Sequence, residues 1–134
     1  MSVSYVRNLV RQWCNEAAAS EGVPFYDTIN RNVKPAGPVW FTVEFVAEAT
    51  EGTFCTPDLR ENGFVDLVVI ARPGIGDSAA LGALESLVPT LMAKADPNGQ
   101  LTLDSYDPVQ EDSAGTADSD YRMSVVLNYS FGRV

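Results

Sequence analysis

The amino-acid sequence predicts an α+β domain: two helices cover one face of a four-stranded, mainly antiparallel sheet, in the order α-β-β-α-β-β. Three observations predict it. Two segments space their apolar residues at the three-to-four interval of a helix, and four segments have the alternation or β-rich composition of strands. The chain has 134 residues, of which 46% are hydrophobic. A single two-layer domain over residues 1–134 is therefore expected.

The first helix is predicted by apolar residues that share one helical face: Val3, Val6, Val10, Trp13 and Ala17. Ser2 or Ser4 can cap its start, and Gly22 followed by Pro24 can end it. Residues 23–38 contain three prolines and have no clean period. We expect an ordered but irregular connection there.

The first pair of strands is predicted by alternation in residues 39–49 and again in residues 64–71. A long polar segment separates them, so an antiparallel pair with a projecting loop at 50–62 is expected. Residues 100–106 predict a short third strand, and residues 121–131 predict a closing strand with one apolar face. Between them, residues 107–120 are polar and acidic, and we expect a loop.

The second helix is predicted by an apolar face downstream of residue 77: Ala80, Leu84, Leu87 and Leu91, joined by Leu81 and Val88. Pro89 falls inside this pattern. Because proline removes one backbone hydrogen bond, a kink or an early end near Val88 is expected.

The segment ARPGIGDSAALGALESL at 71–87 has the outline of a dinucleotide-binding turn, since Gly74 and Gly76 lie between a strand and a helix. Asp96, about twenty residues on, could stand for the ribose-binding acid of that fingerprint. Asp77, however, lies at the helix start, where a pyrophosphate needs positive potential. Its carboxylate suits a helix cap instead. We interpret the glycines as a tight corner between strand and helix, and expect no cofactor.

Composition argues against catalysis and against tight nucleic-acid binding. The formal net charge is −9 and there is no histidine, so phosphate-neutralising bases are few and the commonest general base is missing. The two cysteines, Cys14 and Cys55, are not in a C-x-x-C pattern and suit a reducing compartment. No segment approaches a membrane span. We expect no enzyme activity and no membrane association.

The acidic charge is concentrated in residues 95–121, which carry seven acids and no base. This polarity can support head-to-tail contact between copies, or it can mark a solvated loop. The acids at 107–120 are candidates for a channel lining or a solvent loop: Asp107, Glu111, Asp112, Asp118 and Asp120. A calcium site there is conceivable, but the spacing is not that of an EF-hand, and no metal is expected.

Two aromatic residues lie where a strand or loop faces outward. Trp40 is on the polar face of the first strand, and Phe54 is in the loop that follows. Each is either tucked under a loop of its own chain or an anchor at an interface, where aromatic side chains dominate the binding energy.

In several segments the chain resembles phage tail terminator proteins. VPFYDTINRNVKPAGPVWFTVEF at 23–45 resembles their Pro-aromatic and Pro-Gly-Pro segments leading into a Trp-bearing strand. VDLVVIARPGIGDSAALGALESL resembles their second strand, Gly-x-Gly corner and second helix, and MSVVLNYSF their last strand. The residues that carry the resemblance are Pro24, Pro35, Gly37, Pro38, Trp40, Gly74, Gly76 and Leu84. Pro89 and the long acidic segment after residue 107 depart from the pattern.

This resemblance implies a structural protein of the virion. Such proteins form hexameric rings that cap the tail tube, end its polymerisation and present the other face to head-completion or connector proteins. DNA passes through the channel without specific binding. The implied location is the tail–head junction of the virion, with assembly in the host cytoplasm.

Candidate contacts with the tube or with a neighbouring subunit are Phe54, Arg31, Lys34, Arg60 and Trp40. Two other functions stay open. A head–tail connector or completion protein is also a small ring-forming protein, and a small ligand-binding α+β domain belongs to a different class.

Overall fold

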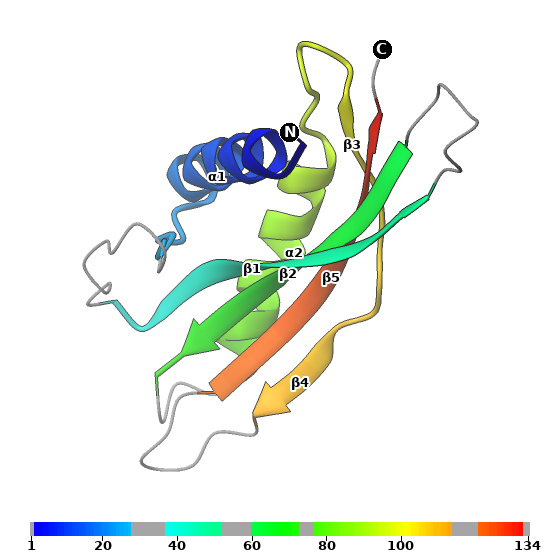
Figure 1. The fold of residues 1–134 in the computed structure, drawn as a ribbon. Helices are drawn as coiled ribbons and strands as arrows, with labels where there is room; N and C mark the ends of the chain where they lie inside the picture. Colours follow the sequence, from blue (N-terminus) through cyan, green and yellow to red (C-terminus); the bar gives the residue numbers. More distant parts are fainter. Residues whose placement is uncertain (1, 28–36, 52–59, 73–76, 114–120, 133–134) are drawn as a thin grey trace.

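The computed structural model describes residues 2–27, 37–51, 60–72, 77–113 and 121–132, and for residues 2–3, 46–51, 60–61, 77 and 111–113 it describes the backbone alone. Within these ranges lie two helices and five strands (Figure 1). Their bounds are α1 Ser2–Glu21, β1 Val39–Glu51, β2 Arg60–Ala71, α2 Asp77–Met92, β3 Leu101–Tyr106, β4 Gln110–Ser113 and β5 Tyr121–Gly132.

The strands form one antiparallel sheet in the order β1-β2-β5-β3, with β4 also paired to β5. β3 lies beside the second half of β5, from Leu127 to Phe131, while β4 lies beside its first part, from Arg122 to Ser124. The two short strands therefore form one interrupted edge of the sheet. The predicted fold class is confirmed: four strand positions, two helices, and the order α-β-β-α-β-β.

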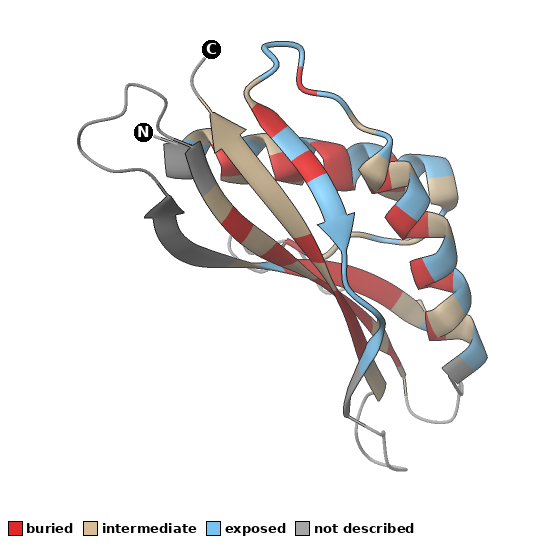
Figure 2. Cartoon of the chain, turned by 90° about the vertical axis from the view of Figure 1, so that its right-hand side faces the viewer, coloured by how far each residue is buried: buried red, intermediate tan, exposed pale blue. Residues whose placement is uncertain are grey.

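Both helices pack on the same face of the sheet, and the core lies between the two layers (Figures 1 and 2). The strand residues that face the helices are every second one, as the two-residue period of a strand requires. On β5 the apolar face predicted from the sequence is confirmed, with Met123, Val125 and Leu127 buried. On the helices the buried residues are Val6, Val10, Trp13, Cys14, Ala17, Ala80, Ala83, Leu84, Leu87, Val88 and Leu91.

The first helix ends where the sequence predicts. Gly22 has a positive φ of 71° and its N–H bonds to the carbonyl of Ala18 at 3.0 Å. Glycine adopts this left-handed conformation without a steric penalty, so it suits the C-terminal cap of a helix.

The second helix does not end at Val88, so the predicted early end is wrong. α2 continues through Pro89 to Met92, and the N–H of Ala93 bonds to the carbonyl of Pro89 at 3.1 Å. The bond that proline cannot make would have gone to the carbonyl of Glu85, an exposed residue. Glu85 and Pro89 are both exposed, so the missing bond lies on the solvent side of the helix, and the burial of Leu91 holds its last turn.

Both predicted loops are shorter than expected. β1 extends to Glu51 and β2 begins at Arg60, because the ladder resumes after an irregularity between Ala47 and Thr50. Only residues 52–59 of the predicted loop at 50–62 lie outside the strands, and they are not described. Within the acidic segment 107–120, Gln110–Ser113 forms β4. The backbone of these polar residues pairs with β5. The polarity of their side chains predicts a loop and gives no sign of this pairing.

β2 begins before residue 64, where the sequence predicts its start, and includes Gly63. The ENG sequence is typical of turns, yet Gly63 lies inside the strand, directly opposite Tyr129 of β5. A Cβ atom at residue 63 would lie 2.5 Å from Oη and 2.7 Å from Cζ of Tyr129. The tyrosine ring thus occupies the space that any other residue would need, and glycine here serves packing across the strands.

Gly63→Ala should lower the free energy of unfolding by about 1–3 kcal/mol, because the new methyl group overlaps the Tyr129 ring. Urea unfolding of the single variant and of Gly63→Ala in a Tyr129→Ala background measures the effect. In that background the cost should disappear. Gly82→Ala in α2 is the control: nothing lies within 4 Å of its new Cβ, so it should stabilise the chain by about 0.5–1 kcal/mol. An equal cost of Gly63→Ala in both backgrounds would contradict this packing account.

Candidate subunit interface

Most of the interface residues predicted from the sequence are not placed by the structure. Phe54, Arg31 and Lys34 lie outside the described residues. The backbone of Arg60 pairs with Glu51 on one side and Gly132 on the other, at the start of β2.

Only some of the acidic candidates lie in the described residues. Asp118 and Asp120 lie outside the described residues, while Glu111 and Asp112 belong to β4. Asp107 is exposed at the break between β3 and β4, where one carboxylate oxygen accepts a hydrogen bond from Nδ2 of Asn128 at 3.2 Å.

Of the two interpretations of Trp40, the structure supports the one in which its own chain covers the side chain. It is 1% exposed, and the guanidinium of Arg72 lies 5.0 Å from its ring centroid. Arg72 also donates from Nε to the carbonyl of Gly37 at 3.0 Å and from its backbone N–H to Pro38 at 2.9 Å. The tryptophan is on the side of β1 away from the helices, as predicted, but contacts within the chain bury it.

The rest of that sheet face is also partly covered by the chain itself. Nη2 of Arg122 on β5 lies 3.5 Å from Oε1 of Glu44 on β1. The register places β2 between these two strands, so the arginine crosses the central strand near Val68, which is 1% exposed. Both charged groups are largely solvated, and such a pair adds at most about 1 kcal/mol. The middle of this face is thus not an open apolar surface.

The β1 edge of the sheet is covered at one point only, as far as the described residues show. The N–H and C=O of Phe41 bond outward to Pro24 and Tyr26, at 2.9 and 2.8 Å. Every second residue of a strand points the same way, so Val43 and Phe45 also direct their backbone groups outward. Beyond Phe41, no described segment pairs with this edge.

Two arginines of α1 lie over the side chain of Phe45 on this edge. The guanidinium carbons of Arg7 and Arg11 are 5.2 and 5.6 Å from its ring centroid. Arg11 is also paired with Asp27, at 3.5 Å between Nε and Oδ2. The β1 edge therefore presents a basic and aromatic surface, which we call the α1–β1 edge.

The opposite edge of the sheet presents an apolar groove with acidic neighbours. It lies between α2 and the segment that joins β3 to β4, and its volume is about 500 Å³. Tyr106 and Val109, at 58% and 46% exposure, are its most exposed apolar residues. The remaining wall is formed by Leu81, Leu84, Val88, Pro89, Met92 and Val125, with Glu85, Asp107 and Pro108 beside them.

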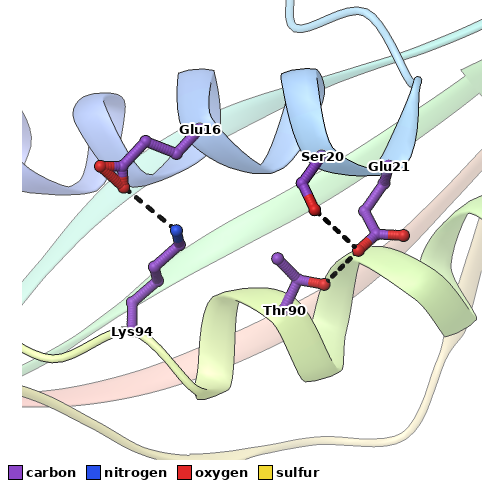
Figure 3. A network of polar contacts seen from close by, with 5 residues as sticks. All are labelled: Glu16, Ser20, Glu21, Thr90 and Lys94. Atoms are coloured by element: carbon purple, nitrogen blue, oxygen red, sulfur yellow. Dashed lines mark hydrogen bonds and ion pairs between the residues drawn. The ribbon is translucent and has the colours of Figure 1, made fainter.

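The helices that carry these two surfaces are joined by polar contacts (Figure 3). Oε1 of Glu21 in α1 accepts a hydrogen bond from Oγ1 of Thr90 in α2 at 2.6 Å. Nζ of Lys94, just past α2, lies 3.1 Å from Oε2 of Glu16. Both contacts lie on the side of α1 toward α2, and they help to hold one edge of the domain relative to the other.

Asp96 has a structural role that the nucleotide interpretation does not allow. Its carboxylate accepts hydrogen bonds from the backbone N–H groups of Asn98, Gln100 and Leu101, at 2.9, 3.1 and 2.9 Å. The hydroxyl of Tyr5 lies 2.7 and 2.9 Å from its two oxygens. With its acceptor positions occupied, Asp96 ties the first turns of α1 to the turn before β3 and offers nothing to a ribose.

These contacts shift the pKa of both partners. Burial acts to raise the pKa of Asp96, but the hydrogen bonds from Tyr5 and the three backbone groups outweigh it and hold the pKa below its ordinary value. The pKa of Tyr5 is raised, first because its hydroxyl donates to Asp96 and then because it is partly desolvated.

The described residues hold no assembled metal centre. They contain no group of three or more Cys, Asp or Glu side chains able to bind a metal ion. Cys14 is a free, buried thiol whose pKa is raised to about 12, mainly by burial and also by the charge of Asp27. A thiol in that state is no nucleophile at neutral pH. No helix among the described residues is long and apolar enough to span a membrane.

Asp96→Asn should lower the free energy of unfolding at neutral pH by about 1–3 kcal/mol, because three backbone N–H groups, that of Leu101 buried, lose a charged acceptor. The folded pKa lies below the unfolded value of about 3.9, so this stabilisation is present above that value and lost as the pH falls through the folded pKa. Denaturant unfolding across that range measures it. The difference between the two proteins should shrink with acidification. Asp104→Asn, an exposed control on β3, should stay within about 0.5 kcal/mol. A difference independent of pH would contradict this role.

Comparisons with known proteins bear on the fold alone. No family model matches the sequence, and no curated protein matches it. A solved structure whose name describes no function is similar over 100% of this chain and 98% of its own, with 19% identity and a TM-score of 0.64. At that identity the likeness supports the architecture and carries no function.

Proposed function

We propose that this chain is a phage tail terminator: a structural virion protein that forms a hexameric ring on the tail tube. The ring ends tube polymerisation and provides the surface that joins tail to head. In this proposal the chain is not an enzyme and needs no cofactor.

The observation that carries the proposal is the convergence of four of the eight residues on which the resemblance rests. The carbonyl of Pro24 accepts a hydrogen bond from the N–H of Phe41 on β1. Gly37 and Pro38 are bonded to Arg72, which also covers Trp40. Pro24, Gly37, Pro38 and Trp40 thus lie together at the start of β1, against the Arg72 that follows β2. They act together in the fold, which supports treating them as one family pattern.

The distribution of charge supports the same function. The chain has a net charge of −9, and the interrupted β3–β4 edge carries exposed Asp104 and Asp107. Acidic walls repel the DNA backbone, which lets a nucleic acid pass a channel without adhering to it. A ring needs two different surfaces that fit one another, and the two edges of this sheet differ in character.

In the mechanism we propose, monomers bind one another weakly in solution and assemble on the last ring of the tube, whose surface contacts the segment around Phe54. The completed ring presents a surface unlike that of the tube, so no further tube subunit can add. Its outer face then binds the head-completion or connector protein.

A head–tail connector or completion protein is the second candidate, since the acidic, two-edged domain suits any ring around DNA. A twelve-fold ring would favour it, and a six-fold ring favours the tail cap. A small ligand-binding domain would instead be a monomer with a saturable ligand. Micromolar binding of NAD or ATP would support that third function.

Tails assembled with Phe54→Asp should be longer than normal and lack a terminal ring, because a charge replaces an apolar contact with the tube. Electron microscopy of tails from a phage carrying the variant measures their length. Phe54→Leu, which keeps an apolar side chain, is the control and should give normal tails. Deletion of the whole chain should also give overlong tails. Normal-length, capped tails after deletion would overturn the proposed function, whereas normal tails with Phe54→Asp alone would remove Phe54 from the contact.

A further inference from the structure

We propose that the groove between α2 and the β3–β4 edge binds the α1–β1 edge of a second copy of this chain, with Arg7 of one copy against the acidic rim of the next. The inference rests on the proposed ring and states which two surfaces make its repeated contact.

The groove has the composition of an interface core. Tyr106 and Val109 are the large apolar residues that are exposed among those described, and both line it. Aromatic anchors surrounded by a polar rim are typical of sites that bind another protein. Burial of an apolar side chain that is otherwise in water is favourable. A partner that covers Tyr106 and Val109 therefore gains in affinity.

The acidic charge beside the groove favours the basic α1–β1 edge as its partner. Glu85 and Asp107 are exposed beside the groove, and a basic partner surface would complement them. Among the described residues, Arg7 is the one basic side chain whose guanidinium contacts an aromatic ring and no described oxygen. The other described basic side chains each contact a carboxylate or carbonyl oxygen: Arg11, Arg72, Lys94 and Arg122.

The two surfaces can meet only between copies. β1 and the β3–β4 position lie at opposite ends of the sheet, with β2 and β5 between them. When two copies join through different surfaces, one groove and one α1–β1 edge stay free at the ends of the pair. Further copies can therefore add head to tail, and a ring closes when the rotation between neighbouring copies divides a full turn. The long stem of Arg7 can lie along apolar side chains while its charged end reaches Asp107.

Docking by side chains fits this edge better than pairing of strands. The β3–β4 edge is interrupted at residues 107–109, which include Asp107 and Pro108. A charge and a proline on an edge strand oppose the addition of another strand. In β3 only Leu101 and Leu103 are buried, and the residues from Asp104 to Tyr106 are all exposed beside this break (Figure 2).

A charge exchange tests the contact. The oligomeric state of the purified full chain, of Arg7→Glu, of Asp107→Arg and of their equimolar mixture is measured by sedimentation velocity over a range of concentrations. Wild type should associate weakly at its highest concentrations, and each single variant should associate at least about tenfold more weakly, because each substitution places like charges against one another. The mixture should recover association, since alternating copies restore opposite charges at every contact. A ring rescued in this way has an even number of subunits.

Controls separate the contact from general effects of charge and folding. Gln12→Glu and Arg7→Gln each change the net charge by one unit on the same helix, and Gln12 is exposed; only Arg7→Gln should weaken association. Circular dichroism verifies that each variant folds. Tyr106→Ser, at a mostly exposed position, should weaken association without loss of stability.

Three results would overturn the inference: a wild type that stays monomeric at its highest soluble concentration, single variants that associate like wild type, or a mixture that is not rescued. None of them bears on tail length. Conversely, if the exchange behaves as expected but tails lacking the chain have normal length, the contact stands and the tail-cap function falls.

Discussion

The pairing of β2 with β5 is the interaction on which the rest of the structure depends. It runs without a register shift from Arg60 opposite Gly132 to Ala71 opposite Tyr121. The other ladders each contain an irregularity: β1 with β2, β3 with β5, and β4 with β5. The two central strands therefore set the alternation of buried and exposed residues, and the outer strands can bend away from them without losing the core.

The regular pairing thus lies in the middle of the sheet, and its two edges carry different side chains. On the helix side, Leu67 and Val69 of β2 and Val125 of β5 are buried and pack with both helices in one core. At the edges, β1 has Phe45 under two arginines, whereas the β3–β4 edge has an apolar groove beside exposed carboxylates. Since a sheet with two unlike edges can associate head to tail, the fold supplies the asymmetry that a ring requires.

Sequence patterns predicted the elements whose stability depends on burial of a periodic face. The face of α1, the inward row of β5 and the helix end at Gly22 were all predictable, because each follows from a local rule. Pro89 shows the limit of such rules. The hydrogen bond that it removes lies on the exposed side of α2, and the side of the helix that faces solvent is known only from the structure. Gly63 shows another, since its reason is a tyrosine sixty-six positions away in sequence, at residue 129.

The candidate site was harder to predict than the fold. Trp40 was correctly assigned to the outer face of β1, but its burial by Arg72 depends on where the end of β2 meets Gly37 and Pro38. The groove combines residues of α2 with Tyr106 and Val109, which have no shared sequence pattern. Composition does predict the acidic side of that surface, because the acids cluster in residues 95–121, but not the apolar groove beside them.

The central claim is that copies of this chain join edge to edge in a six-fold ring. Electron cryomicroscopy of the protein assembled on its tail tube tests it most directly, since it gives the rotational symmetry and the identity of the touching surfaces together. The account predicts six copies, with the α1–β1 edge of each copy seated in the groove of the next. A ring of another symmetry, or a six-fold ring in which Tyr106 and Arg7 both face solvent, would contradict it.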